Sequence, residues 1–134
     1  MFVSTQIQLA ARPLGWPTHD DFRTVQVTHG PLQDGEVRVR NAFVSVDPYM
    51  RGRMNDTRSY VAPYALGETV TGGAVGRVVE SADPSLPVGT AVLHQHGWSD
   101  AVQAPASTFR AVAEIPGVPL SVHLHVLGMT GLTA

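Results

Sequence analysis

The sequence predicts a mainly β domain, a barrel or a sandwich of short strands rather than a bundle of helices. Its 13 glycines and 10 prolines are spread along the 134 residues and cut the chain into short pieces. Short apolar segments between turn residues are typical of β structure. The length suits one domain with its own core, and we find no repeat or linker that would divide it.

Three strands are expected in the first part of the chain. They run from Phe2 to Leu9, from Phe22 to Val27 and from Glu36 to Val46. Pro13, Gly15 and Pro17 mark the loop after the first strand, and Pro31 to Gly35 forms a turn before the third. The third strand is the clearest, because apolar and charged residues alternate along it. After Phe43 it becomes apolar on both faces, which predicts that its end is buried.

Four more strands and one short helix are expected in the second part. The strands run from Val75 to Glu80, from Thr90 to His94, from Ala101 to Ala104 and from Phe109 to Ile115. The turn from Asp83 to Gly89 separates the first two of these. Pro119 and Ser121 favour a short helix with Ser121 as its N-cap. Its apolar face would hold Leu124, Val126 and Leu127.

Composition excludes several classes of function. The chain has no cysteine, so disulfides and thiolate metal sites are excluded. A net charge of -2 gives no electrostatic case for nucleic acid or acidic lipid. The charged share of 15% is low against the usual ~25%, which suggests a surface that partly meets something other than water. No signal peptide is evident, and prolines, glycines and histidines argue against a membrane helix in 115–134, so we expect a cytoplasmic protein.

Two residue patterns imitate binding sites. The first pattern is a glycine spacing like that of a phosphate loop, with Gly67, Gly72, Gly73 and Gly76. A phosphate loop is followed by a helix, whereas residues 77–80 are strand-like. We therefore interpret the glycines as sites of close packing or a bulge. The second pattern consists of two histidine pairs, His94 with His96 and His123 with His125. Residues two apart share a strand face, yet no carboxylate accompanies these pairs, and we expect half-buried histidines and no metal.

The segment from Val46 to Met54 has the strongest functional signal. Pro48 fixes the backbone, and Tyr49, Met50 and two arginines follow directly. Tyr49 can bury its ring and donate from its hydroxyl, and Arg51 can bind an anion or hold a loop. On spacing alone, a core or surface tyrosine and a solvated arginine remain open. Trp16 and Trp98, each beside Gly or Pro, are expected to anchor loops by packing.

Several motifs occur together in a fixed order. They are Leu14-Gly15-Trp16-Pro17-Thr18, Gly35-Glu36-Val37-x-Val39-Arg40, Val46 to Met54, Ser59-Tyr60 with Pro63, Gly67 to Ser81, Gly97-Trp98-Ser99 and Leu127 to Ala134. In this combination the chain resembles, over nearly its whole length, the zinc-independent, NADPH-dependent medium-chain reductases of the alkenal/one, prostaglandin and curcumin type. The resemblance implies a GroES-like, partly open β-barrel with short helices over residues 1–126. Residues 127–134 would begin the interdomain helix, the junction to a Rossmann domain absent from this chain.

The resemblance also implies a reaction. NADPH would reduce the C=C bond of an α,β-unsaturated ketone or aldehyde, with Tyr49, Tyr60 and Arg51 on the substrate side. Met129 and Thr133 match positions that approach the nicotinamide. The main catalytic donor is expected in the second half of the family's fold, so no catalytic residue is assigned. This chain alone is therefore expected to be inactive, and the natural chain to continue and to form a homodimer through that half.

The resemblance bears on zinc as well. Asp47 stands where the zinc-dependent relatives carry a cysteine, and Gly67-Glu68-Thr69 stands where they carry Gly-His-Glu. Both replacements remove preferred zinc ligands. Two alternatives stay open: a stand-alone GroES-like binding or assembly module, and a relative of the zinc-type alcohol dehydrogenases.

Overall fold

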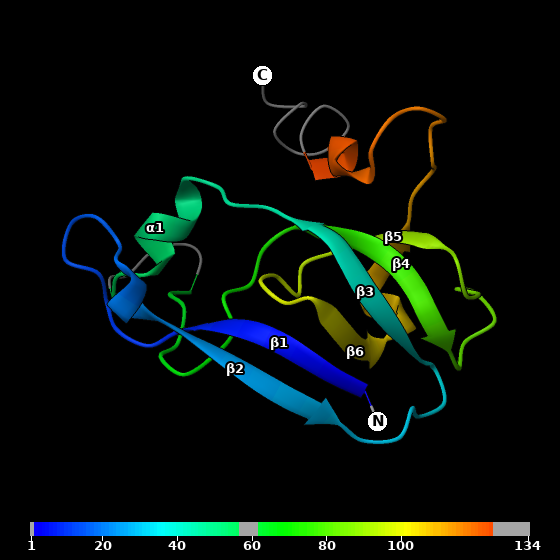
Figure 1. Cartoon of the computed structure of the whole chain (residues 1–134), viewed down its shortest axis with the longest axis horizontal. Coiled ribbons are helices and arrows are strands. Elements are labelled where there is room, and N and C mark those ends of the chain that lie inside the picture. The colour runs from blue at the N-terminus through cyan, green and yellow to red at the C-terminus, as the bar shows by residue number, and fades with distance from the viewer. Residues whose placement is uncertain (1, 57–61, 125–134) are drawn as a thin grey trace.

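Two antiparallel sheets form the molecule, of which the computed structural model describes residues 2–56 and 62–124 (Figure 1). β1 (Phe2–Leu9) pairs with β2 (Phe22–His29) in a two-stranded ribbon. The second sheet has the order β6-β3-β4-β5-β7. Its strands are β3 (Glu36–Val44), β4 (Ala74–Ser81), β5 (Ala91–His94), β6 (Ala101–Pro105) and β7 (Phe109–Ala111). The predicted mainly β, GroES-like, partly open barrel is confirmed.

Short helices connect the strands. They are α1 (Tyr49–Arg53) and the 3-10 helices η1 (His19–Asp21), η2 (Ala106–Thr108) and η3 (Leu120–Leu124). In the described part of the chain no helix has the length and apolar character needed to cross a membrane. The predicted domain boundary after residue 126 lies outside the described residues.

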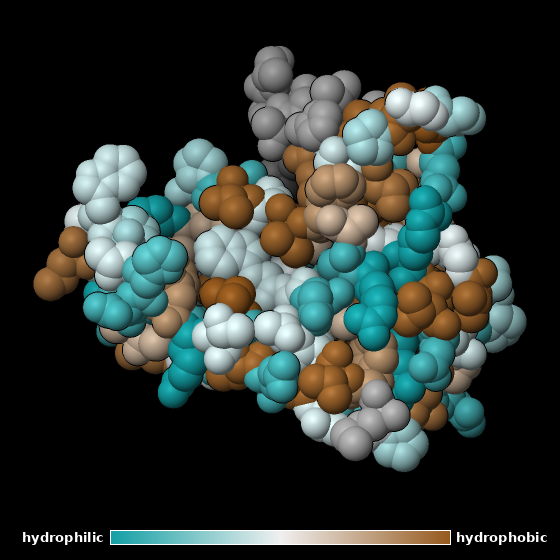
Figure 2. All heavy atoms as spheres, viewed as in Figure 1, coloured by the Kyte–Doolittle hydropathy of each residue, from teal (hydrophilic) through white to brown (hydrophobic). Residues whose placement is uncertain are grey.

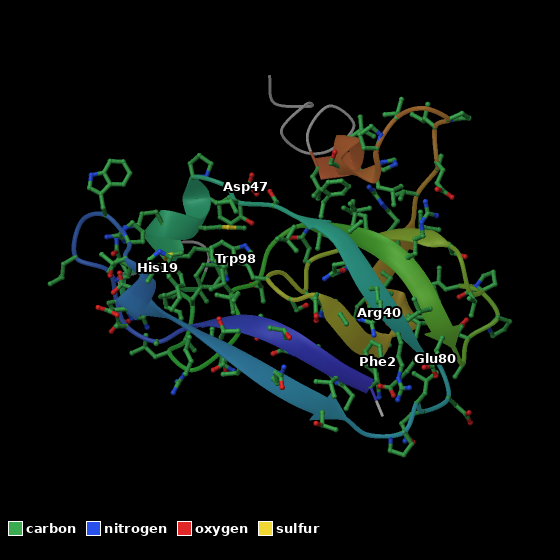
Figure 3. All side chains as sticks on the ribbon, viewed as in Figure 1. Phe2, His19, Arg40, Asp47, Glu80 and Trp98 are labelled. Atoms are coloured by element: carbon green, nitrogen blue, oxygen red, sulfur yellow. The ribbon has the colours of Figure 1, made fainter. Side chains whose placement is uncertain are left out.

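The alternation in β3 places one row of its side chains in the core. Val37 and Val39 are fully buried, where they pack with Val78, Leu86, Val92 and Phe109. Arg38 and Arg40 point to the other face, and both guanidinium groups lie over the ring of Phe2, at 4.9 and 5.5 Å from its centroid (Figure 3). These contacts join the first strand to the outer face of the five-stranded sheet, because a cation is attracted to the face of an aromatic ring.

The free edge of β1 closes the barrel by pairing with two loops. Ile7 donates from its backbone N–H to the Trp98 carbonyl at 2.9 Å, and Val70 donates to the Ile7 carbonyl at 3.1 Å. Leu9 donates to the Glu68 carbonyl at 3.2 Å. β1 therefore has backbone partners on both edges, β2 on one and the 67–70 and 98–100 loops on the other.

Gly76 lies at an irregularity where β3 crosses β4. The register of the two strands shifts between Asn41 and Phe43, and Gly76 stands opposite Asn41. A Cβ built on Gly76 would overlap the Arg40 carbonyl oxygen. The interpretation of the glycine spacing as close packing or a bulge is thus confirmed at this position.

Three sequence-based expectations were wrong. β3 ends at Val44, and its apolar end is exposed, with Val46 at 76%, because pairing with β6 stops at Arg40 and leaves β4 as its one strand neighbour. β7 ends at Ala111 rather than Ile115, because its partner β5 begins at Ala91. Ser121 does not cap a helix: it lies within η3, in which Val122 donates to the Pro119 carbonyl at 3.2 Å.

The first testable prediction concerns Gly76. Gly76→Ala should lower the free energy of unfolding by about 3 kcal/mol, because the added methyl group has no room beside the Arg40 backbone. Urea unfolding followed by circular dichroism measures this change. Gly30→Ala is the matched control, since a Cβ at Gly30 has no neighbour within 4 Å. Equal stabilities of the two variants would contradict the close approach of β3 and β4.

A second prediction concerns pH. His94 is buried and bridges two segments: its Nδ1 accepts from the His96 backbone N–H at 3.1 Å, so Nε2 carries the hydrogen and donates to Asn41 Oδ1 at 2.7 Å. Burial, followed by the neighbouring His96, lowers the pKa of His94 to about 4. The unfolded chain binds this proton near pH 6.5 and the folded chain does not, so acid favours unfolding.

The contribution of His94 to the free energy of unfolding should therefore be fully present above pH 6.5. It should be lost as the pH falls towards 4, and the loss should reach about 3 kcal/mol. The measurement is the free energy of unfolding at several pH values, for the wild-type protein and for His94→Gln. The variant should show a flatter pH dependence in this window. Parallel curves would show that His94 does not carry the effect.

Candidate functional site

The turn from β3 into α1 is fixed by its own polar groups. Ser45 Oγ donates to Asp47 Oδ2 at 2.6 Å, and the Met50 N–H donates to the Asp47 carbonyl at 3.0 Å. Pro48 has φ -56° and ψ -34°, so the backbone is already helical when α1 begins at Tyr49. Figure 3 shows Asp47 on this turn, at the upper edge of the barrel. The turn therefore holds Tyr49 in one place.

One side of α1 enters the core and the other does not. Met50 and Met54 are buried against Leu9, Tyr64 and Val70, whereas Tyr49 is 47% exposed. Gly72 and Gly73, which precede β4, come next to this part of the molecule. Gly72 lies close to the side chains of Met50 and Tyr49.

The contacts of these glycines show why they are small. A Cβ on Gly72 would overlap Met50 Cε and would lie 3.6 Å from the Tyr49 hydroxyl oxygen. A Cβ on Gly73 would lie 3.2 Å from Leu124 Cδ2. The two glycines therefore let the backbone pack closely between α1 and η3, where an added side chain would crowd its neighbours.

Trp98 ties a third segment to the same turn. Its Nε1–H donates to the Ser45 carbonyl at 3.0 Å, and its ring packs on Phe22 at 5.8 Å between centroids. Figure 3 shows Trp98 below Asp47, on the loop that follows β5. The expectation that Trp98 anchors a loop is confirmed.

Two tyrosines near α1 have different environments. Burial raises the pKa of Tyr49, Asp47 raises it further, and Arg53 opposes this. The Tyr49 phenol is therefore protonated at neutral pH and can donate a hydrogen bond. The Tyr64 hydroxyl is already used, since it donates to the Thr71 carbonyl at 2.7 Å, and Arg53 lies 4.2 Å above the Tyr64 ring.

Arg51 holds the loop between β1 and η1. Its Nε donates to the Gly15 carbonyl at 2.9 Å, one terminal nitrogen donates to the Pro13 carbonyl at 3.0 Å, and the other donates to Asn55 Oδ1 at 2.6 Å. This loop presents Trp16 to solvent, 90% exposed, so the expectation that Trp16 packs as an anchor was wrong. A contact of Arg51 with substrate stays a prediction.

The other predicted site residues divide into two groups. Tyr60, Met129 and Thr133 lie outside the described residues. His96 is half-buried, as expected, whereas His94 is buried because it lies under Phe109 and His96; the two histidine rings are 5.2 Å apart and both lie against Phe109. Within residues 2–56 and 62–124, no group of three or more His, Asp or Glu side chains is placed to hold a metal ion.

An exposed apolar surface surrounds Tyr49. Phe43, Val44 and Val46 are 42%, 39% and 76% exposed. Figure 2 shows brown, apolar spheres between α1 and η3 on this side of the molecule. A separate hollow of about 270 Å³ includes Gln6, His29, Thr71 and His96 in its lining, but neither Tyr49 nor Arg51. An apolar surface beside one phenol donor suits a small ligand with a single polar group.

Sequence reasoning missed the parts of the site that come from distant segments. Gly72 and Gly73 were interpreted as close packing, which their contacts with Met50 and Leu124 confirm, but Ser45 was not singled out. The adjacent glycines are a signal of close approach, but the sequence does not say that α1 is what approaches. The contact between Trp98 and Ser45 joins residues 53 positions apart and leaves no local signal.

The fold and this turn are those of the N-terminal domain of a medium-chain oxidoreductase. A family model described as the N-terminal domain of oxidoreductase matches residues 5–112, and the chain belongs to this family. The predicted resemblance to the alkenal/one, prostaglandin and curcumin reductases is thereby confirmed.

Its relatives are NADP-dependent enzymes by name. A Bacillus subtilis protein with the provisional name NADP-dependent oxidoreductase is 44% identical over 96% of this chain and 38% of its own length. The NADPH-dependent curcumin reductase of Escherichia coli is 40% identical over 94% of this chain and 36% of its own length. The crystal structure of CurA from Vibrio vulnificus has a TM-score of 0.85 at 37% identity, over 97% of this chain and 38% of that one. The chain thus spans less than two fifths of these relatives.

The geometry around Arg51 generates a third prediction. Arg51→Ala should speed amide hydrogen exchange at Ala10 and Ala11, which donate to the Asp21 carbonyl at the base of this loop, because the loop loses the bonds from Arg51 to the Pro13 and Gly15 carbonyls. The free energy of unfolding should fall by about 2 kcal/mol. The control is Arg110→Ala on β7, an exposed arginine far from this loop in the sequence. Unchanged exchange in the Arg51 variant would contradict the assigned role.

Proposed function

We propose that this chain is the substrate-side domain of an NADPH-dependent reductase that saturates the C=C bond of α,β-unsaturated ketones and aldehydes. The observation that carries the proposal is the half-exposed Tyr49 phenol, held by the Asp47–Pro48 turn above Gly72 and Gly73 and beside an apolar surface. The names of the relatives support it, since they include a curcumin reductase, a prostaglandin reductase and a 2-alkenal reductase. A CurA structure contains NADPH.

The chemistry divides between the cofactor and the chain. NADPH, when bound, supplies the hydride for the β-carbon of the substrate. Negative charge then grows on the substrate carbonyl oxygen, and a placed hydroxyl donor is often worth about 3 kcal/mol there. Tyr49 is a donor of this kind: its raised pKa keeps its proton in place, and the turn fixes its position. We assign Tyr60 and Arg51 to the same substrate side.

The described residues offer apolar surface beside this phenol, on Phe43, Val44 and Val46. Gly72 and Gly73 are themselves buried beneath Met50 and Leu124, so they support this side of the molecule from below. We propose that Met129 and Thr133 lie against the nicotinamide and that a Rossmann domain of the same protein binds the rest of the cofactor. A homodimer of the complete protein and its cytoplasmic location stay predictions.

We propose that the reaction proceeds without zinc. Asp47 and Glu68 occupy the two positions at which the zinc-dependent relatives carry Cys and His. One oxygen of the Asp47 carboxylate accepts a hydrogen bond from Ser45 at 2.6 Å, so the carboxylate has a structural partner in the turn. A carboxylate pair of this kind is a poor substitute for the soft ligands that hold zinc in a tetrahedral site.

The fourth prediction tests this function in the complete protein. With NADPH and a simple enone, the wild-type protein should consume NADPH, followed by its absorbance. Tyr49→Phe and Tyr60→Phe should each lower kcat/KM for the enone about a hundredfold, because each loses a donor worth roughly 3 kcal/mol at the developing charge, and leave the Kd of NADPH unchanged. The reason is that each variant removes a hydroxyl without emptying the volume of the ring.

Tyr64→Phe is the matched control. Its hydroxyl is bonded to the Thr71 carbonyl, so this variant should lose stability rather than affinity for the enone. Normal kcat/KM in the Tyr49 or Tyr60 variant would remove that residue from the site. A wild-type protein that holds stoichiometric zinc, oxidises alcohols and leaves enones unreduced would overturn the proposed function.

A further inference from the structure

The outer edge of β2 carries backbone groups with no partner among the described residues. On β1, Thr5, Ile7 and Leu9 direct their N–H and C=O groups to the 67–70 and 98–100 loops. The residues between them therefore face β2, and the register pairs Ser4 with Val27 and Gln6 with Val25. In an antiparallel ladder these partners exchange both hydrogen bonds. The N–H and C=O groups of Thr24, Gln26 and Thr28 consequently point away from β1.

This edge lacks the features that normally block pairing. β2 has eight residues, and its register with β1 is unbroken, so no bulge twists the edge away. Its sequence, from Phe22 to His29, contains neither proline nor lysine and has one charged residue, Arg23. Natural edge strands are usually short, bulged or charged, because an open edge accepts another strand. Figure 1 shows β2 along the lower margin of the molecule, on the opposite side from η3.

We propose that β2 pairs antiparallel with β2 of a second copy of this chain, so that a four-stranded sheet β1-β2-β2-β1 crosses a two-fold axis. Outward-facing residues must meet outward-facing residues for hydrogen bonds to form. The register that achieves this places Gln26 opposite Gln26 on the axis and Thr24 opposite Thr28 of the other copy. Each of these three residues then donates one backbone hydrogen bond and accepts another.

The side chains favour a second copy over an unrelated peptide. In this register the exposed face of the new sheet carries Thr opposite Thr, a favourable cross-strand pair. On the inner face Val25 meets Val27 of the other copy, and both side chains are already half-buried. A slip of one residue would set outward-facing backbone groups opposite inward-facing ones and would lose these hydrogen bonds. The strand is thus complementary to itself, as a closed two-fold interface requires.

Two double variants test the pairing and its register in the full 134-residue chain. Thr24→Lys/Thr28→Lys places like charges opposite each other twice, whereas Thr24→Lys/Thr28→Glu places opposite charges there. Both threonine side chains are exposed, and they lie roughly 13 Å apart along one strand, so both variants should fold like the wild-type chain. Sedimentation equilibrium over roughly a hundredfold range of concentration measures the dimer dissociation constant.

The expected result is a concentration-dependent wild-type dimer. Its dissociation constant should be higher in the Lys/Lys variant than in the Lys/Glu variant by about tenfold at low salt, and high salt should reduce this difference. A wild-type chain that stays monomeric over the whole range would overturn the proposal, even if an extended peptide binds the edge. Equal dissociation constants for the two variants would also overturn it, because the dimer would then use another surface.

Discussion

The second edge of β1 is the constraint on which the rest of the structure depends. Thr5, Ile7 and Leu9 satisfy their backbone groups with the 67–70 and 98–100 loops, and without these bonds a nearly closed barrel would bury unpaired N–H and C=O groups. The same two loops continue into Gly72 and contain Trp98. The pairing of β1 therefore also positions Gly72 beneath Tyr49 and positions the Trp98 ring that donates to the Ser45 carbonyl.

Close backbone approach is the second requirement, and glycine meets it where two loops cross. Gly97 has φ +83°, and a Cβ there would overlap the Val70 carbonyl oxygen. Its left-handed backbone turns the chain so that Trp98 donates its N–H to that same carbonyl at 2.9 Å. At Gly76 the cause is different, because φ is ordinary and space alone demands the missing side chain. Within the glycine spacing that imitates a phosphate loop, Gly72 and Gly76 therefore mark close contacts, whereas Gly67 supplies a turn at φ +81°.

The sequence predicted what local patterns determine. Alternation in β3 and the turn residues between strands were enough for the strands and the fold class, and the ordered combination of motifs, with the residues around Pro48 among them, was enough for the family. The patterns could not reveal which apolar segment finds a partner: Val46 looked buried and is exposed, because β6 stops pairing at Arg40. Trp16 is exposed on a loop whose Gly15 carbonyl is held by Arg51, 36 positions along the chain, and such a distant contact leaves no local signal.

The division of work within the Tyr49–Arg53 helix follows from these contacts. For Arg51 to bind a substrate directly, it would have to release Gly15, Pro13 or Asn55, and a hydrogen bond from a charged donor is worth about 1.5–3 kcal/mol. Tyr49 would give up nothing comparable, because its ring is half-exposed and its phenol keeps its proton. If the proposed function holds, Arg51 would therefore act by holding the loop in place, and Tyr49 would be the residue of this helix that touches the substrate.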